Sequence, residues 1–525
     1  MPEAPSPSRP RPGLAPAARD IEPALRLSPD THLDARQLTT LAALERPGVE
    51  FGPSAIAAME RSEAALLAAH AAGTPIYGLT TGFGPLVCFD ASAGGGHPEG
   101  HGAGLLAHLG AGWGTWMPAT VVRAAMIARC ATLSRGFSGI GRGVAESLAA
   151  LLGHGIVPAV PELGSVGASG DLVPMAHVAR VMTGAGLVRT EAGDAVPAAG
   201  VLHACGLAPQ PLSGREALSL VNGTNFMTAY AALSLDAADR LLAHAESLTG
   251  WIYRLLGARA EALDPRLHRA RGHAGQLASA AAIRAEASRD GDWEDVGRPL
   301  QEVYSLRCAP QFLGACRDQL QYARQTIETE LNGVSDNPVT WACEGAPAIL
   351  HGGNFQGQQL AFAADSINAA MVQCGVLAER QLDVLLNPEF NGDAPPLLAW
   401  EPGPTAGMAG AQITATALVA EMRHHGGPAA TSSMPTNGRN QDVVSMGLMA
   451  ARQAHGQADR LAGILAILMI GGRQLDHLRT EGRATGPHAA PPHGAPAYEP
   501  FNWDRALEPD VRRIATELLR VSPED

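Results

Sequence analysis

Lysine is absent from this chain. The 525 residues include 38 basic side chains, and every one of them is arginine. A pyridoxal phosphate enzyme needs a lysine to form a Schiff base with its cofactor, and the phosphate-binding P-loop needs a lysine as well. The sequence therefore excludes both of these classes of protein.

Net charge, apolar run length and cysteine spacing exclude further classes. The formal net charge is −13, which argues against nucleic acid or an anionic membrane surface as a partner. The most apolar run, Leu461 to Gly472, is too short to span a bilayer, so we expect a buried core helix there. The seven cysteines form no Cys-x-x-Cys pair. This pattern favours reduced thiols in a cytoplasmic protein, without a metal site, over a disulfide framework.

Composition and periodicity divide the chain into three segments. Residues 1–30 are rich in Pro, Ala and Arg and predict a disordered tail. Residues 31–220 mix short helical periodicity with turn residues and predict a smaller mixed domain. Residues 221–525 carry long periodic stretches, such as 224–249 without Gly or Pro, and predict a long-helix bundle with an exposed loop at 481–500. The expected fold class is mainly α.

An octapeptide of small residues is the most informative motif: Gly164-Ser165-Val166-Gly167-Ala168-Ser169-Gly170-Asp171. Taken alone, such a composition indicates a flexible loop. It resembles the self-processing loop of the aromatic amino acid ammonia-lyases and the related aminomutases. The resemblance implies that the Gly170 nitrogen attacks the Ala168 carbonyl, and that loss of two waters leaves a methylidene-imidazolone built from Ala168, Ser169 and Gly170. Natural side chains are nucleophiles, acids or bases, so an enzyme that needs an electrophile must make or import one.

The segment from Tyr77 to Gly84 resembles the mobile tyrosine loop of the same family. Ammonia elimination requires removal of a weakly acidic β-proton, and a Tyr77 phenolate would serve if local dipoles lower the pKa of this residue. The three glycines of the segment suit a loop that opens for substrate and closes to exclude water. We expect Gly84 to contact the substrate.

A third block, Tyr304 to Gln311, offers an anchor for the substrate carboxylate. The Arg307 guanidinium is a bidentate partner for such a group. The resemblance places Tyr304 near the reacting carbon and Gln311 in the pocket. It also implies that Asn222 polarises the imidazolone carbonyl, where charge accumulates. Further substrate contacts implied by the resemblance are Leu172, Asn337, Phe355, Asn437, Asn440 and Gln441.

The pair His108-Leu109 aligns with the selectivity pair of the family. The resemblance associates His-Leu with tyrosine, Phe-Leu with phenylalanine and Ser-His with histidine. A His108 nitrogen can pair with a phenol hydroxyl, and a site built for that hydroxyl penalises phenylalanine. We expect conversion of tyrosine to p-coumarate with weaker turnover of phenylalanine. Asn225 and Phe226 stand where smaller residues are common, so a narrower pocket is expected.

The resemblance further implies a fold of the fumarase/aspartase type and a homotetramer in which each active site draws residues from three subunits. Several functions stay open at this point. They are a histidine or phenylalanine ammonia-lyase, a tyrosine 2,3-aminomutase that returns the amine to the β-carbon, and an inactive helical assembly protein. The reaction product separates these alternatives, because an arylacrylate plus ammonia indicates a lyase and a β-amino acid indicates a mutase.

Overall fold

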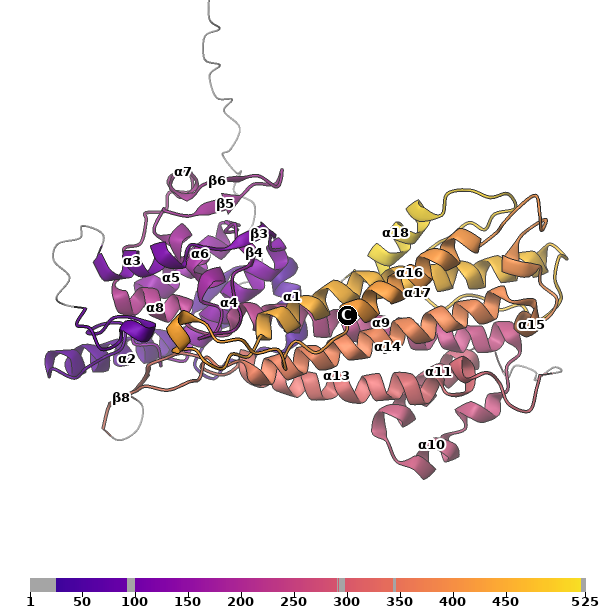
Figure 1. The fold of residues 1–525 in the computed structure, drawn as a ribbon, viewed down its shortest axis with the longest axis horizontal. Helices are drawn as coiled ribbons and strands as arrows, with labels where there is room; N and C mark the ends of the chain where they lie inside the picture. Colours follow the sequence, from indigo (N-terminus) through magenta and orange to yellow (C-terminus); the bar gives the residue numbers. More distant parts are fainter. Residues whose placement is uncertain (1–24, 92–99, 290, 292–297, 343–345, 521–525) are drawn as a thin grey trace, which may run out of the picture.

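Helices dominate the computed structural model of the chain (Figure 1). The structure describes residues 25–91, 100–289, 291, 298–342 and 346–520. The tail expected over residues 1–30 therefore lies mostly outside the described residues. Residues 25–27 are not part of a tail, however, because they form strand β1 (Leu25–Leu27), whose Leu27 is fully buried.

Short helices and two-stranded sheets make up the N-terminal part. Asp34 caps α1 in a reciprocal arrangement with Gln37, and a proline in the first turn begins α2. The helices are α1 (Ala35–Ala43), α2 (Pro53–Ala71), α3 (Gly100–Leu109), α4 (Ala119–Ser134), α5 (Arg142–Gly153), α6 (Leu172–Met182), α7 (Ala198–Ala204) and α8 (Gly214–Val221), with a 3-10 turn η1 (Gly84–Leu86).

The sheets are all two-stranded pairs. Strand β1 pairs in parallel with β2 (Val49–Phe51), and the other three pairs are antiparallel. These are β3 (Trp113–Trp116) with β4 (Pro161–Leu163), β5 (Leu187–Arg189) with β6 (Ala195–Pro197), and β7 (Val339–Trp341) with β8 (Ala348–Leu350).

Long helices form a bundle beside this part. The segment without Gly or Pro that begins near Thr224 becomes α9 (Asn225–Leu256), which ends where Gly257 adopts a left-handed conformation. Helix α14 (Gln358–Leu386) packs along α13 (Ala309–Leu331) and α17 (Gly447–Thr480), and α9 packs along α17. Shorter elements complete this half: α10 (Pro265–Arg271), α11 (Ala274–Ala287), α12 (Tyr304–Arg307), α15 (Pro388–Asn391), α16 (Ala409–His424), α18 (Glu508–Leu518), η2 (Ala260–Leu263), η3 (Pro396–Leu398) and η4 (Asn437–Arg439).

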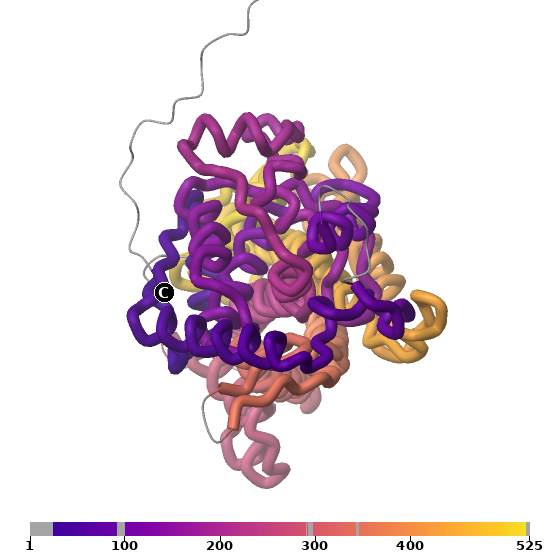
Figure 2. The backbone as a smooth tube through the Cα atoms, turned by 90° about the vertical axis from the view of Figure 1, so that its left-hand side faces the viewer, coloured from indigo at the N-terminus to yellow at the C-terminus, as the bar shows by residue number. Residues whose placement is uncertain are grey.

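The two halves lie end to end along the long axis of the molecule. Figure 1 shows the indigo to magenta N-terminal segments at one end and the long helices running away from them. Viewed from that end, the N-terminal segments stand in front of the bundle (Figure 2). No helix or strand occupies residues 481–507, yet the Ala489 carbonyl accepts a hydrogen bond from Trp251 Nε1 at 2.9 Å, which ties this segment to α9.

Two helices, α14 and α17, are long and apolar enough by composition to cross a membrane. In the fold, 67% and 83% of their most apolar windows are buried. The run Leu461 to Gly472 lies inside α17, and its Leu461, Ile464 and Leu465 are fully buried. The prediction of a core helix at this run is confirmed. The helix extends well beyond the apolar run on both sides.

Candidate active site

A cavity of about 1070 Å³ lies where the N-terminal part meets the first turns of the bundle. Fourteen of the seventeen residues that the sequence analysis assigned to the site line it. They come from segments far apart in the chain: Tyr77, Gly84, His108, Leu109, Ala168, Ser169, Gly170, Leu172, Asn222, Asn337, Phe355, Asn437, Asn440 and Gln441.

The Ala168-Ser169-Gly170 loop has an unusual backbone. Ser169 adopts a positive φ of 67°, and Gly167 and Gly170 also have positive φ. A Cβ atom at position 170 would lie 2.1 Å from the Gly223 carbonyl oxygen, so only glycine fits there. The Asp171 N–H donates to the same oxygen at 2.7 Å. The loop is thereby clamped against the residues that precede α9.

Two amide side chains contact Ser169. Asn222 Nδ2 donates to the Ser169 carbonyl oxygen at 2.9 Å, and Gln441 Nε2 donates to Ser169 Oγ at 2.9 Å. Both residues belong to motifs that the sequence analysis assigned to the pocket. The structure thus brings the amide donors to the two oxygen atoms of the residue whose chemistry the sequence singled out.

A buried arginine, Arg129, holds the backbone of Asn222 in place. Its guanidinium is fully buried, forms an ion pair with Asp336 at 3.2 Å and donates to the Asn222 carbonyl oxygen at 3.1 Å. Arg215 lies beside this pair and donates to the Ser138 and Pro338 carbonyls. Neither arginine was predicted from the sequence. For Arg129, one of two arginines in the apolar α4 run, that apolar surrounding was the available signal.

Asp171 is a fully buried carboxyl directly after the loop. It accepts hydrogen bonds from the Met227 N–H at 2.8 Å and from Ser165 Oγ at 3.1 Å. Burial disfavours the charged form more than these donors stabilise it, and raises the pKa of Asp171 to about 7. This carboxyl therefore titrates near neutral pH.

Tyr77 reaches into the cavity from its loop. Its hydroxyl oxygen accepts a hydrogen bond from the Gly84 N–H at 2.8 Å. Burial raises the pKa of Tyr77 above its usual range, and the Gly84 N–H opposes this rise without overcoming it. The lowered pKa that the sequence analysis required of this base is therefore not met within the single chain.

The tyrosine loop rests on η4. A Cβ atom at Gly84 would lie 2.6 Å from Asn437 Nδ2, so the loop approaches this turn closely. Asn437 and Arg439 both have positive φ, a conformation that costs non-glycine residues free energy. The η4 turn, against which the tyrosine loop packs, therefore has an uncommon backbone conformation.

His108 and Leu109 line the cavity at the end of α3. His108 Nδ1 lies 3.1 Å from the Gly104 carbonyl oxygen, which can only accept. The neutral ring must therefore carry its proton on Nδ1, and Nε2 is left as an acceptor. Phe83 stacks on His101 at 4.3 Å between ring centroids and forms part of the same wall.

Phe226 does not narrow the pocket. The side chain is fully buried in the core and is not among the residues that line the cavity. The expectation of a narrower pocket from Asn225 and Phe226 was therefore wrong, because helix α9 directs Phe226 inward.

Three predicted residues, Tyr304, Arg307 and Gln311, lie outside this cavity. Gln381, near the end of α14, donates a hydrogen bond to the Ser305 carbonyl and so lies beside the Tyr304 block. The start of α14 lies near the cavity instead, where Gly357 packs closely against Met227. Twenty-three residues of helix separate Gln358 from Gln381, a length of about 35 Å at the usual rise per residue. The Tyr304 block thus lies at the far end of the bundle.

Tyr304 of this block faces solvent in the single chain, and Arg307 is half-buried beside it. Tyr304 is 66% exposed, and the Arg307 guanidinium stacks 4.5 Å from its ring centroid. Arg307 Nε donates to the Glu302 carbonyl at 2.8 Å, and no side-chain carboxylate of the described residues pairs with this guanidinium. A half-buried arginine beside an exposed tyrosine is available to a group outside this chain.

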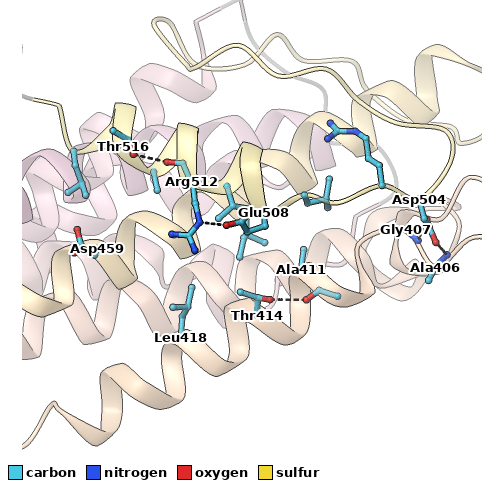
Figure 3. A pocket seen from close by; sticks show the side chains of 18 residues that line it. Ala406, Gly407, Ala411, Thr414, Leu418, Asp459, Asp504, Glu508, Arg512 and Thr516 are labelled. Atoms are coloured by element: carbon cyan, nitrogen blue, oxygen red, sulfur yellow. Dashed lines mark hydrogen bonds and ion pairs between the residues drawn. The ribbon is translucent and has the colours of Figure 1, made fainter. Parts of the chain in front are cut away.

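A second cavity of about 750 Å³ lies between α16, α17 and α18 (Figure 3). Ala411 and Leu418 of α16 line it, and the Arg512–Glu508 pair of α18 crosses it. It contains none of the predicted site residues. Within the described parts of the chain, no three His, Cys, Asp or Glu side chains gather in a way that could hold a metal ion.

A helical bundle that brings an asparagine and a tyrosine to an Ala-Ser-Gly loop defines a class of carbon–nitrogen lyases. Residues 33–494 match the family described as aromatic amino acid lyase. The chain belongs to this family. The predictions of family membership, of a carbon–nitrogen lyase and of a mainly α fold are therefore confirmed.

Curated relatives and solved structures agree with this assignment. The chain is 42% identical over 431 residues to a tyrosine ammonia-lyase from Cupriavidus metallidurans, covering 78% of this chain and 80% of the relative. It is 38% identical over 522 residues to a tyrosine ammonia-lyase from Cereibacter sphaeroides, covering 96% and 98%. The solved tyrosine aminomutase from Streptomyces globisporus is 34% identical with a TM-score of 0.84, covering 94% of this chain and 97% of that one.

Proposed function

We propose that this enzyme deaminates L-tyrosine without oxidation, giving p-coumarate and ammonia. One observation carries the choice of substrate. His108 Nδ1 donates its hydrogen bond to the Gly104 carbonyl, so Nε2 can accept a hydrogen bond from a phenol hydroxyl in the cavity. The two curated relatives are both tyrosine ammonia-lyases, which supports the same choice.

We further propose that the 168–170 triplet matures into a methylidene-imidazolone, and the residues present fit this group. Position 170 has no room for a side chain. Gln441 donates to Ser169 Oγ, the hydroxyl that must leave as water. Asn222 donates to the Ser169 carbonyl oxygen, which remains as the ring carbonyl. When formed, the group supplies an electrophile that no natural side chain offers.

The chain's own residues bind and prepare the substrate. The Asn222 amide stabilises negative charge on the Ser169 carbonyl oxygen, because the donor is already in place at 2.9 Å. As a phenolate, Tyr77 is positioned to take the β-proton on its oxygen and so becomes a neutral phenol, and the Gly84 N–H stabilises the phenolate before the transfer. The tyrosine loop lies against η4 at this end of the cavity, and its closure over a bound substrate would exclude water there.

We propose that the enzyme is a cytoplasmic homotetramer whose subunits share active sites. Tyr304 is exposed and Arg307 is half-buried beside it. Both lie about 35 Å along the bundle from their own cavity by the helix rise, so another copy can present them to it. Among the described residues that line the cavity there is no arginine, so they offer no such anchor for a carboxylate. The six described cysteines are unpaired, which supports a reducing compartment.

The test compares substrates and one variant of the pocket. The purified enzyme is incubated with tyrosine, phenylalanine and histidine, and arylacrylate formation is followed by ultraviolet absorbance. We expect p-coumarate to form fastest, and His108→Phe to shift preference toward phenylalanine. His154→Phe, at an exposed helix end away from the cavity, serves as the matched control. Faster release of urocanate from histidine than of p-coumarate from tyrosine contradicts the proposal.

An aminomutase is the second candidate, supported by the solved tyrosine aminomutase at 34% identity. An aminomutase would use the same site residues, so the reaction product distinguishes it from an ammonia-lyase. Chromatography that finds a β-amino acid as the main product from tyrosine selects the mutase. Mass spectrometry of the peptide carrying Ser169 separates both from an inactive protein, because an active enzyme lacks the mass of two waters there.

A further inference from the structure

The tyrosine loop packs against the first turn of α3 through two stacked rings. Phe83 of the loop and His101 of α3 lie with their ring centroids 4.3 Å apart and their planes 7° from parallel. Phe83 also meets the Tyr77 ring edge-on, with 6.1 Å between centroids and 89° between planes. All three side chains line the cavity. A continuous series of ring contacts therefore joins α3 to Tyr77.

The His101 ring is held in place by the start of α8. A Cβ atom at Gly214, the first residue of α8, would lie 2.5 Å from His101 Cδ2. Helix α3 itself is held at the same place, since a Cβ atom at Gly102 would lie 2.2 Å from the Leu212 carbonyl oxygen. These two glycines let α3 and the start of α8 pack closely. The imidazole is therefore a fixed surface, whereas Phe83 belongs to a loop that we expect to open for substrate.

Hydrogen bonding at Nε2 does not explain why a histidine stands at position 101. This nitrogen is buried and has no hydrogen-bond partner among the described residues. A buried polar atom without a partner costs free energy. The face of the ring, in contrast, is in contact with Phe83, and stacked aromatic pairs are stabilised beyond the area that they bury. What His101 offers to the loop is therefore its flat ring.

We infer that His101 is a positioning residue for the reaction: its imidazole holds Phe83, and Phe83 in turn places Tyr77 for removal of the β-proton. The inference rests on the proposed function, because it takes Tyr77 as the base. The Tyr77 oxygen accepts a hydrogen bond from the N–H of Gly84, the residue next to Phe83. A shift of Phe83 thus moves both the ring beside Tyr77 and the donor to its oxygen. Such placement matters, because a displacement of about 1 Å in a reacting group can lower a rate about 100-fold.

The experiment measures kcat and KM for L-tyrosine with the wild-type full chain, His101→Leu and His101→Phe. Leucine has no flat face, so kcat should fall about tenfold, equivalent to about 1.4 kcal/mol and near the upper end for aromatic pairs. We expect kcat/KM to fall equally, which is the pattern for an interaction made in the transition state. Phenylalanine restores the stack and removes the unpartnered nitrogen, so its kcat should lie within about twofold of the wild type.

A double variant tests whether the effect passes through Phe83. His101→Leu and Phe83→Leu each remove the same stacked pair, so the double variant should be no slower than the slower single variant. Mass spectrometry of the peptide that carries Ser169 should show the loss of two waters in every variant. A His101→Leu chain that retains these waters overturns the inference, because its activity would then be lost with the electrophile and not with the placement of Tyr77.

His203→Leu and His203→Phe are the matched controls, since His203 is exposed near the end of α7 and lies outside the cavity. We expect no change in kcat for either. Wild-type kcat in His101→Leu overturns the inference, as do losses that multiply in the double variant. A His101→Phe chain as slow as His101→Leu also overturns it, because the loop would then depend on the imidazole nitrogens. Wild type that forms no p-coumarate refutes the proposed function itself, and the role of His101 with it.

Discussion

Removal of either charge from the buried cluster behind Asn222 should destabilise the protein, and by unequal amounts. Arg129 and Asp336 have no exposed side-chain surface, and Arg215 lies close enough to interact with both. The cluster thus contains two positive charges and one negative charge. Asp336→Asn leaves two buried guanidiniums without a carboxylate, whereas Arg129→Met leaves Arg215 opposite Asp336. We expect Asp336→Asn to be the more damaging change.

The magnitude follows from the burial of the pair. Breaking a buried ion pair by removing one partner costs about 3–5 kcal/mol. Unfolding entropy near 2.1 cal/mol/K per residue gives roughly 1.1 kcal/mol/K for this chain, so each kcal/mol lowers Tm by roughly 1 °C. We therefore expect Asp336→Asn to lower Tm by roughly 3–5 °C. Arg129→Met should lower Tm by a smaller amount, because one opposite charge remains.

Thermal unfolding followed by circular dichroism measures both changes. The control is Arg142→Met, which breaks an ion pair with Glu146 whose side chains are 52% and 44% exposed. Exposed pairs contribute about 0–1 kcal/mol, so the control should melt close to the wild type. An Asp336→Asn variant that melts with the control, or an Arg129→Met variant less stable than Asp336→Asn, refutes the reasoning.

Three further predictions concern activity and pH. Tyr77→Phe should fold and lose turnover by about 10²–10⁴-fold, the usual contribution of a positioned base; steady-state kinetics with unchanged kcat would assign the proton to another group. Arg307→Lys should raise KM for tyrosine about ten- to hundredfold, since lysine keeps the charge and loses the fork, a loss of about 1.5–3 kcal/mol; a wild-type KM would place the carboxylate elsewhere. Because burial raises the pKa of Asp171 to about 7, the stability that its protonated form contributes is present at low pH and is lost as pH rises through that value. The Tm of Asp171→Asn relative to wild type should therefore improve between pH 5 and pH 8, and a constant difference across this range would contradict the shift.

Most residues of the site could be predicted from the sequence, because each motif itself contains the side chains that carry the proposed chemistry. Ser169, Asn222 and Gln441 could be assigned to one pocket from their motifs, although their contacts span up to 272 residues of sequence. Helix existence was also predictable from the stretches without Gly or Pro, as in α9. The C-terminal end of α17 could not be predicted in this way, because the polar residues within this buried helix resemble residues that end a helix.

Other features depend on three-dimensional surroundings that no local pattern records. Arg129 resembles an ordinary helical arginine until Asp336, 207 residues away, is placed beside it. The pKa of Tyr77 depends on how deeply the loop is buried, and burial reversed the expected direction. The distance of Arg307 from the cavity depends on the length of α14, which the motif alone does not contain.

The contacts around Ser169 also order events during synthesis of the chain. Asn222 follows Ser169 by 53 residues and Gln441 follows it by 272. A ribosome that has released only the first half of the chain has made the triplet and its flanking glycines, and has not yet made the second amide donor. The triplet and both amide donors can therefore meet only after residue 441 has emerged and the segment before α17 has folded against the loop. A nascent or truncated chain that stops short of residue 441 lacks the donor to Ser169 Oγ.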